Sequence, residues 1–214
     1  MNLKVKICGM REPENILAVA ELRPELLGFI FYHDSPRYAA EFLNPEILSK
    51  LLPYITKAGV FVDADFEEIT ETVRKYSLDM VQLHGNETPE VCHRLRDAGI
   101  EVIKAFNMNE SSDFKMCSQY ITCTNYFLFD ALTTFYGGSG HKFDWRILDS
   151  YNSGHPFFLS GGITHMDAGN ILKITNSSFI GVDLNSRFEI KPGLKDIEKL
   201  KNFISELRIN NKPS

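Results

Sequence analysis

The chain has 214 residues, of which 43% are hydrophobic and 24% charged, and its formal net charge is −5. This composition is typical of a globular protein with a sizeable core, and the length fits one domain spanning residues 1–214. The acidic balance gives no reason to expect a nucleic-acid partner, and no apolar run reaches the roughly 18 residues that span a bilayer.

Eight short apolar runs recur along the chain, and each is followed by a polar or glycine-bearing loop. Their starts lie about 22 to 31 residues apart, the size of one strand–loop–helix–loop unit. The predicted strands are KVKICG (4–9), LLGFIFY (26–32), KAGVFV (57–62), DMVQLHG (79–85), EVIKAF (101–106), NYFLFDA (125–131), PFFLSGG (156–162) and FIGVDLN (179–185). Four of the intervening segments predict helices, at 12–22, 65–76, 88–99 and 196–207.

Near-continuous apolar strands that alternate with helices indicate a parallel sheet covered by helices. Eight such units in just over 200 residues favour a single (β/α)8 barrel, an α/β fold of the TIM-barrel type. A doubly wound open sheet is the structural alternative that the pattern leaves open.

A barrel places its functional groups at the C-terminal ends of the strands and in the loops that follow them. Those ends carry Cys8, His84, Asp130 and Asp183, among other polar residues. Alternation along the first strand predicts that Lys6 faces the barrel axis together with Cys8. The same parity pairs Gln82 with His84, Leu128 with Asp130, and Gly181 with Asp183.

The four cysteines are Cys8, Cys92, Cys117 and Cys123, and their spacing matches no zinc-binding pattern. We interpret them as reduced thiols of a cytosolic, cytoplasmic protein. Cys8 lies where the first apolar run ends in a glycine turn, so a packed structural cysteine and a proton-moving thiol are both open on spacing alone.

An ordered set of motifs resembles the phosphoribosylanthranilate isomerase family of tryptophan biosynthesis. The set comprises KICGM, GFIFYHDSPRY, GVFVD, VQLHGNE, FLFDA with GGSGHKFDW, LSGGI and GVDLNSRFE..PGLKD. Each motif alone is weak, but all eight units match in order from Lys6 to Asp196.

The resemblance implies an Amadori rearrangement of a small-molecule aminoaldose phosphate into an aminoketose phosphate. Such a reaction needs an acid at the furanose ring oxygen, a base at the C2′ proton, and anchors for a carboxylate and a phosphate. It implies no metal and no organic cofactor, because the substrate's own iminium group accepts the electrons.

The family places its general base at Cys8 and its general acid at Asp130. An ordinary thiol pKa near 8.5 suits a base if a cation is nearby, and Lys6 is the candidate cation. A carboxylic acid that follows several apolar residues is partly desolvated, which raises its pKa and suits an acid. A turn-capping role for Asp130 is the structural alternative.

The remaining site residues follow from the same resemblance. Arg37 in HDSPRY is expected to bind the anthranilate carboxylate through its guanidinium fork, with a surface arginine as the alternative. His84 is expected to border the site and to orient the substrate or Asp130, unless it is structural. Asp183 is expected to contact the ribose or to order its loop.

Loops after the seventh and eighth strands are the expected phosphate site, where backbone N–H groups can approach an anion. The candidates are Gly161, Gly162, Asn185 and Ser186. Arg187 departs from the family pattern, and it could reinforce phosphate binding or face solvent. The loop 134–141, which contains GGSG, is a candidate mobile cover, and the sequence leaves monomer or homodimer open.

Three alternatives remain at this point. Lys104 could form a Schiff base as in aldolases, although a structural ion pair with Asp183 or another inward acid is favoured. An isomerase of another aminoaldose phosphate, such as the histidine-pathway substrate, is the second alternative. That substrate has two phosphates, and the first half of the sequence lacks an obvious second glycine-rich phosphate loop. A non-catalytic barrel that binds a partner predicts loss of Cys8 or Asp130, and both are present.

Overall fold

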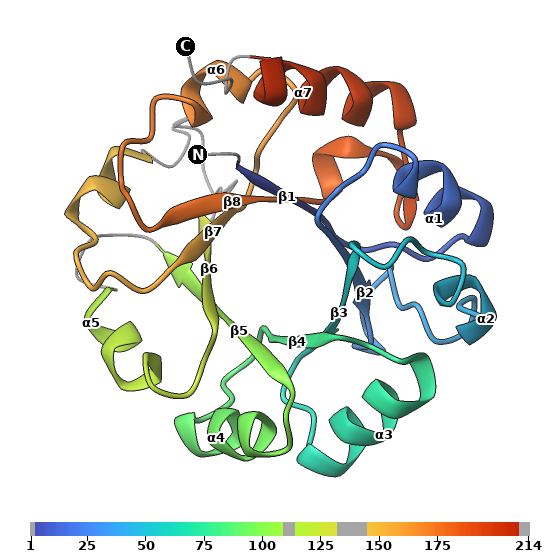
Figure 1. Cartoon of the computed structure of the whole chain (residues 1–214), viewed down its shortest axis with the longest axis horizontal. Coiled ribbons are helices and arrows are strands. Elements are labelled where there is room, and N and C mark those ends of the chain that lie inside the picture. Colours follow the sequence, from blue (N-terminus) through green and yellow to red (C-terminus); the bar gives the residue numbers. More distant parts are fainter. Residues whose placement is uncertain (1–2, 109–113, 132–144, 210–214) are drawn as a thin grey trace.

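The computed structural model describes residues 3–108, 114–131 and 145–209. Eight parallel strands close into one barrel in sequence order, and Figure 1 shows this ring with the helices outside it. The barrel prediction is therefore confirmed, and the open sheet is wrong. The strands are β1 (Lys4–Ile7), β2 (Leu26–Ile30), β3 (Thr56–Phe61), β4 (Met80–Leu83), β5 (Glu101–Met108), β6 (Tyr126–Ala131), β7 (Phe157–Ser160) and β8 (Phe179–Leu184).

All four predicted helices are present, as α1 (Pro13–Ala20), α3 (Phe66–Tyr76), α4 (Pro89–Asp97) and α7 (Ile197–Ile209). Local signals explain their starts: Pro13 and Pro89 occupy first-turn positions, and the Asp65 carboxylate caps α3 by accepting from the Glu68 amide. Shorter segments complete the outer layer, namely α2 (Pro45–Leu48), α5 (Phe114–Cys117), α6 (Ala168–Ile171), and the 3₁₀ turns η2 (Ser118–Tyr120), η3 (Trp145–Ser150) and η4 (Ser186–Phe188).

One element has no counterpart among the sequence predictions. After η4 the chain forms a small antiparallel hairpin of β9 (Glu189–Lys191) and β10 (Leu194–Lys195). Gly193 takes a φ of 82° in the turn, a conformation that favours glycine. This hairpin lies outside the barrel sheet, directly after the loop of β8.

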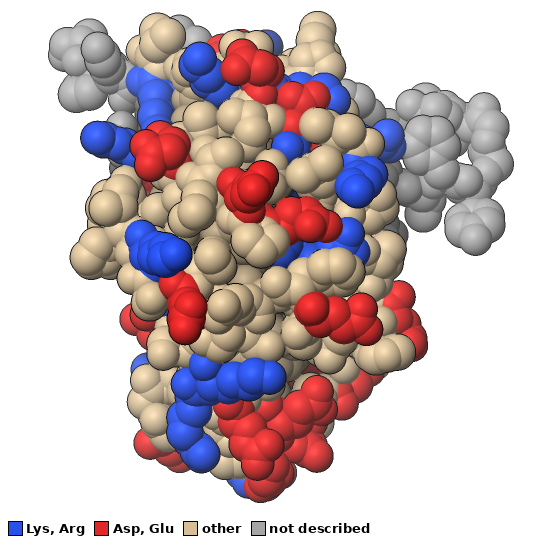
Figure 2. All heavy atoms as spheres, turned by 90° about the vertical axis from the view of Figure 1, so that its right-hand side faces the viewer, with Lys and Arg blue, Asp and Glu red and all other residues tan. Residues whose placement is uncertain are grey.

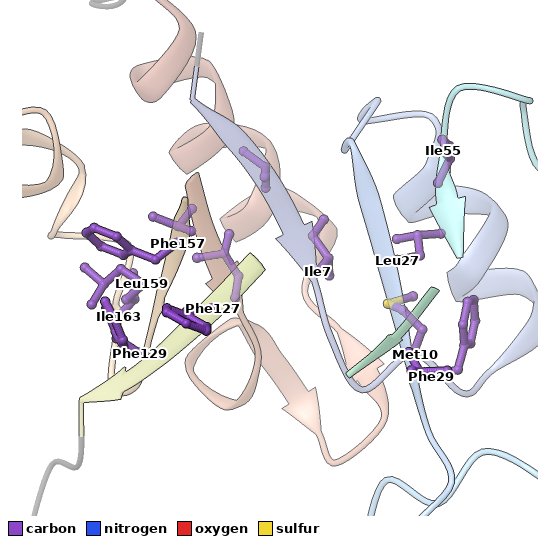
Figure 3. Close-up of a cluster of buried hydrophobic side chains, with 14 of the residues drawn as sticks. Ile7, Met10, Leu27, Phe29, Ile55, Phe127, Phe129, Phe157, Leu159 and Ile163 are labelled. Carbon is purple, nitrogen blue, oxygen red and sulfur yellow. The ribbon is translucent and has the colours of Figure 1, made fainter. Parts of the chain in front are cut away.

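The main core lies between the strands and the helices. Alternate strand residues such as Ile7, Leu27, Phe29, Phe127 and Phe129 are buried there, and Figure 3 shows them with their neighbours on the outer face of the strands. A fully buried side chain of this size contributes about 1.5–3 kcal/mol of hydrophobic stabilisation. The continuous apolar runs therefore serve both faces of the barrel wall.

The inward-facing residues form two levels. Toward the N-terminal ends of the strands, an apolar plug fills the barrel, formed by Leu26, Ala58, Met80, Ile103, Ala105, Leu128 and Phe158. Toward the C-terminal ends, the same strands turn polar. Lys6 lies opposite Asp183 in the register of β1 and β8, and Leu128 is followed by Asp130 two residues later. The predicted strand parity is confirmed at these positions.

The surface carries charges of both signs. Figure 2 shows acidic and basic side chains mixed over the face toward α1 and α2, with no continuous basic stripe on that face. Among the helices within the described residues, none is long and apolar enough to cross a membrane.

Candidate active site

A pocket of about 300 Å³ opens at the C-terminal end of the barrel. This volume is at the lower end of the range for small-molecule sites. Residues from seven of the eight strands or their following loops line it, all but β5: Cys8, Ile30, Val60, Gln82, His84, Asp130, Ser160, Gly161, Gly162, Ile163, Asp183, Asn185, Ser186 and Arg187. The structure thus brings together the predicted acid, base, ribose and phosphate residues.

Cys8 directly follows β1 at the pocket wall, and two nearby glycines allow close contacts: Gly28 with Cys8 itself, and Gly9 with Arg37 and Asn185. At Gly28 on β2, a Cβ atom would lie 2.8 Å from the Cys8 Sγ. Gly9 takes a φ of 75°, and a Cβ there would lie 2.7 Å from both the Arg37 Cδ and the Asn185 Oδ1. The glycine turn after Cys8 was predicted from the sequence, but Gly28 was not singled out, although a glycine inside a strand pattern is a known sign of close approach.

A buried ion pair lies beside Cys8. The Lys6 Nζ is 2.8 Å from the Asp183 Oδ2, and the two side chains are 0% and 4% exposed. Burial alone lowers the pKa of Lys6, but the Asp183 carboxylate outweighs it, so the pKa is raised and the ammonium form persists. The predicted cation next to Cys8 is therefore present, though it is shared with Asp183.

Burial raises the pKa of the Cys8 thiol, and the positive charge of Lys6 opposes this rise without cancelling it. The protonated thiol is consequently the favoured form of Cys8 at neutral pH. A thiolate that does form there is a stronger base than an ordinary one, because basicity increases with the pKa. The other three cysteines are also free and buried.

Asp130 and His84 meet on the other side of the pocket. The His84 Nε2 lies 3.3 Å from the Asp130 Oδ2, and both side chains are about one quarter exposed, at 28% and 24%. On the far side of the imidazole, the Gln82 Nε2 is 2.9 Å from the His84 Nδ1. When Gln82 donates to Nδ1, the ring proton lies on Nε2 and points toward Asp130.

Lys104 forms the structural ion pair that was favoured, but its partner is Glu87. The predicted partner, Asp183 or another inward acid, is wrong because Lys104 does not face the barrel axis. In the strand register it lies opposite Leu83 and Phe127, whose side chains belong to the outer core. Its amine is 3.1 Å from Glu87 and donates to the carbonyl groups of Leu83, Gly85 and Ala105. A buried ammonium with this many acceptors is a structural cation, which removes the aldolase alternative.

The predicted phosphate residues lie together at the rim next to β7 and β8. Gly161 and Gly162 have φ values of 90° and 62°, which other residues rarely adopt, and both line the pocket with Asn185 and Ser186. Arg187 also lines it from an exposed position. A loop with two left-handed glycines presents its backbone closely to a ligand, as anion sites require.

Of the predicted site residues, Arg37 departs most from the sequence prediction in its location and its partner. It is not among the described residues that line the pocket, and its guanidinium is bound to Glu189. The Nε lies 2.9 Å and 3.0 Å from the two carboxylate oxygens, and Nη2 lies 2.6 Å from Oε2. The predicted fork is thus already engaged along one edge by a residue that the sequence analysis did not consider.

Two further points concern residues that the pocket does not include. Within the described part of the chain, no group of three or more His, Cys, Asp or Glu side chains could hold a metal ion. The candidate cover at 134–141 lies outside the described residues.

The sequence was compared with known proteins. The model of a family described as N-(5′-phosphoribosyl)anthranilate (PRA) isomerase matches residues 5–206. The chain belongs to the phosphoribosylanthranilate isomerase family. A family member from Parabacteroides distasonis, named N-(5′-phosphoribosyl)anthranilate isomerase, is 47% identical over 206 residues, which is 95% of this chain and 92% of the relative.

Solved structures of phosphoribosylanthranilate isomerases share the fold. The enzyme from Thermotoga maritima has a TM-score of 0.82 at 32% identity, covering 96% of this chain and 98% of that chain. A structure of a phosphoribosylanthranilate isomerase in complex with reduced 1-(o-carboxyphenylamino)-1-deoxyribulose 5-phosphate has a TM-score of 0.79 at 30% identity, with the same coverage. The resemblance seen in the motifs is thereby confirmed, and membership of this family decides against another aminoaldose phosphate and against a binding module.

Proposed function

We propose that this chain converts N-(5′-phosphoribosyl)anthranilate into 1-(2-carboxyphenylamino)-1-deoxyribulose 5-phosphate. The observation that carries the proposal is that Cys8 and Asp130, the expected base and acid, line one pocket of a barrel that belongs to this isomerase family. They come from β1 and β6, so a substrate lying across the pocket can meet both.

In the proposed reaction, Asp130 gives its proton to the furanose ring oxygen as the C1′–O bond breaks. The anthranilate nitrogen supplies the electron pair, and an open-chain iminium forms. The Cys8 thiolate then removes the C2′ proton, and the electrons of that C–H bond move to the iminium nitrogen. The resulting enolamine tautomerises to the ketone, with a proton added at C1′.

The reaction must start with Cys8 deprotonated and Asp130 protonated. A thiolate on Cys8 with an acid on Asp130 holds as many protons as a thiol with a carboxylate. One proton transfer within the site therefore converts the second state, which burial of Cys8 favours, into the reactive first state. The positive charge of Lys6 supports the thiolate, and the His84 ring, held by Gln82, supports Asp130.

The substrate's two anionic ends have separate candidate anchors. The phosphate is proposed to bind at Gly161, Gly162, Asn185 and Ser186, and Asp183 to accept a hydrogen bond from the sugar. Its Oδ1 is buried without a partner among the described residues, which is costly unless a ligand or water donates to it. Arg37 remains the proposed carboxylate anchor, through the edge of the guanidinium that Glu189 does not occupy.

The experiment is a fluorescence assay with freshly prepared phosphoribosylanthranilate, whose anthranilate emission falls as it is converted. Wild type is compared with Asp130→Asn and with the neighbouring His84→Asn. We expect conversion by wild type, a loss of about 10²–10⁴-fold in kcat for Asp130→Asn, and a smaller loss for His84→Asn. No conversion by folded wild-type protein would refute the proposed function.

A cytoplasmic location and the choice between monomer and homodimer stay predictions from the sequence. The Thermotoga maritima enzyme is described as dimeric. Sedimentation of the wild-type chain measures its own state directly.

A further inference from the structure

Three charged side chains form a buried cluster beside the pocket. Glu189 binds Arg37 on one side, and on the other it lies 2.8 Å from the Lys195 Nζ. Lys195 and Glu189 have side chains that are 0% and 4% exposed, and that of Arg37 is 18% exposed. Burial alone raises the pKa of Glu189, but Arg37 and Lys195 outweigh it, so the pKa is lowered and the carboxylate stays charged.

The geometry at Arg37 leaves part of the guanidinium available. Glu189 binds the edge formed by Nε and Nη2. A guanidinium has five donors in a planar fork, so the edge formed by Nη1 and Nη2 remains for a second carboxylate. The Nη1 group donates to no acceptor within the described residues. Glu189 therefore holds the plane of the fork without using all of it.

Lys195, on the other side of Glu189, contacts the proposed phosphate site. The Lys195 Nζ donates to the Asn185 Oδ1 at 2.8 Å. Because Lys195 has donors only, it fixes the carbonyl end of the Asn185 amide toward itself. The two N–H donors of that amide are thereby left for the pocket that Asn185 lines, which is the orientation an anion requires.

The net charge of the cluster can also affect substrate binding. Burial lowers the pKa of Lys195, and the Glu189 carboxylate opposes this shift. With both cations protonated, Lys195 and Arg37 share one carboxylate and the cluster carries a net positive charge next to the pocket. Both ends of the proposed substrate are anionic, and a net positive neighbour favours them. Without Glu189 the two cations would repel each other and would be free to turn away from the pocket.

The β9–β10 hairpin positions two of the three residues of the cluster, Glu189 and Lys195. Glu189 begins β9, Lys195 ends β10, and the Gly193 amide in the turn donates to the Glu189 Oε1 at 3.2 Å. Asn15 on α1 clamps the backbone of Lys195 by accepting from its amide at 2.7 Å and donating to its carbonyl at 3.0 Å. The position of both charges is thus fixed by the backbone.

We propose that Glu189 is a positioning residue that fixes both anion anchors of the substrate at once. It holds Arg37 for the aromatic carboxylate and, through Lys195, orients the Asn185 amide for the phosphate. This role rests on the proposed function, because it presumes a substrate with a carboxylate at one end and a phosphate at the other.

The test measures binding of two stable ligands, the reduced carboxyphenylamino deoxyribulose phosphate and its phenylamino counterpart without the carboxyl group. The ratio of their dissociation constants reports the contribution of the carboxyl group alone. We expect a ratio of about 10 to 100 for wild type, as for other charge-assisted hydrogen bonds. In Glu189→Gln the ratio should fall to within about threefold of one, while kcat with phosphoribosylanthranilate stays within about threefold and KM rises.

Two matched variants separate the effect of Glu189 on Arg37 from its effect on Asn185 through Lys195. Lys195→Met keeps the pair of Arg37 and Glu189, so it should keep the carboxyl ratio but weaken competitive inhibition by inorganic phosphate, by up to about tenfold. In the Arg37→Ala background, Glu189→Gln should change the ratio by less than about twofold, because the group through which it acts is gone.

If Glu189→Gln does not fold, the double variant Glu189→Gln with Lys195→Met removes one charge of each sign and gives the same prediction. A folded variant of either kind that keeps the wild-type carboxyl ratio would overturn the proposal. Ligand binding needs no turnover, so a failure of the proposed reaction and a failure of the proposed role of Glu189 give different results. Wild type that shows the ratio but converts no substrate would refute the function and leave the role of Glu189 standing.

Discussion

Gly28→Ala tests whether the space beside Cys8 is as tight as the structure indicates. The added methyl would lie 2.8 Å from the Cys8 Sγ, 3.1 Å from the Cys8 Cα and 3.2 Å from the Lys6 Nζ. Ordinary contacts of this kind are 3.4–4 Å. Even if the sulfur turns into the pocket, the Cys8 backbone and the buried Lys6 amine remain within 3.2 Å of the added methyl. We expect a loss of about 1–3 kcal/mol in the free energy of unfolding, typical of overpacking.

The assay is urea denaturation of wild type, Gly28→Ala, Cys8→Ala and the double variant, at constant slope. In the Cys8→Ala background the shortest contact is gone, so the cost of Gly28→Ala should drop below about 1 kcal/mol, which is a coupling between neighbouring residues. The kcat of Gly28→Ala should also fall at least about tenfold, since the displaced thiol misses the C2′ proton. Equal costs of Gly28→Ala in both backgrounds would refute the reasoning.

Three further outcomes are expected from the buried charges. Alkylation of Cys8 by iodoacetamide should rise with pH through a midpoint above the ordinary thiol pKa of about 8.5, because burial disfavours the thiolate; a midpoint below 8 would contradict this. Lys6→Met should move that midpoint further upward, since the thiolate loses its cation, and should cost about 3–5 kcal/mol in stability by leaving Asp183 buried and unpaired. Glu87→Gln should be similarly destabilising through Lys104, and the double variant Glu87→Gln with Lys104→Met should recover part of the loss; no recovery would contradict a paired role.

The barrel could be predicted because its strands are buried on both faces. Each apolar run is bounded by glycine or polar residues, and the starts of the eight runs lie about 22 to 31 residues apart. Polar residues at the ends of these runs, such as Cys8 and Asp130, then fall at the mouth of any barrel. The family motifs and the predicted barrel topology therefore pointed to the same pocket.

The same double-sided burial explains the error at Lys104. Val102 and Phe106 on one face of β5, and Ile103 and Ala105 on the other, are all apolar, so alternation could not tell which face is inward. Only the register with β4 and β6 settles that Lys104 faces outward.

Glu189 and Lys195 stand in the motif GVDLNSRFE..PGLKD that carries the resemblance, but no role was predicted for either, for a different reason. Their short hairpin follows the last strand of the barrel, where the unit pattern has already ended. The dipeptide Pro192–Gly193 between two short runs is a turn signal that could have suggested it. Their contact with Arg37, 152 residues away along the chain from Glu189, is long-range and has no local signal.

The central claim is that Cys8 removes the C2′ proton, and single-turnover kinetics test it most directly. Enzyme in excess is mixed with phosphoribosylanthranilate carrying hydrogen or deuterium at C2′, so that product release does not hide the chemical step. We predict a slower reaction of the deuterated substrate with wild type, and a loss of about 10²–10⁴-fold with Cys8→Ala, which should still bind the reduced carboxyphenylamino ligand. Single-turnover conversion by Cys8→Ala at the wild-type rate would show that the thiol only packs and that another group takes the proton.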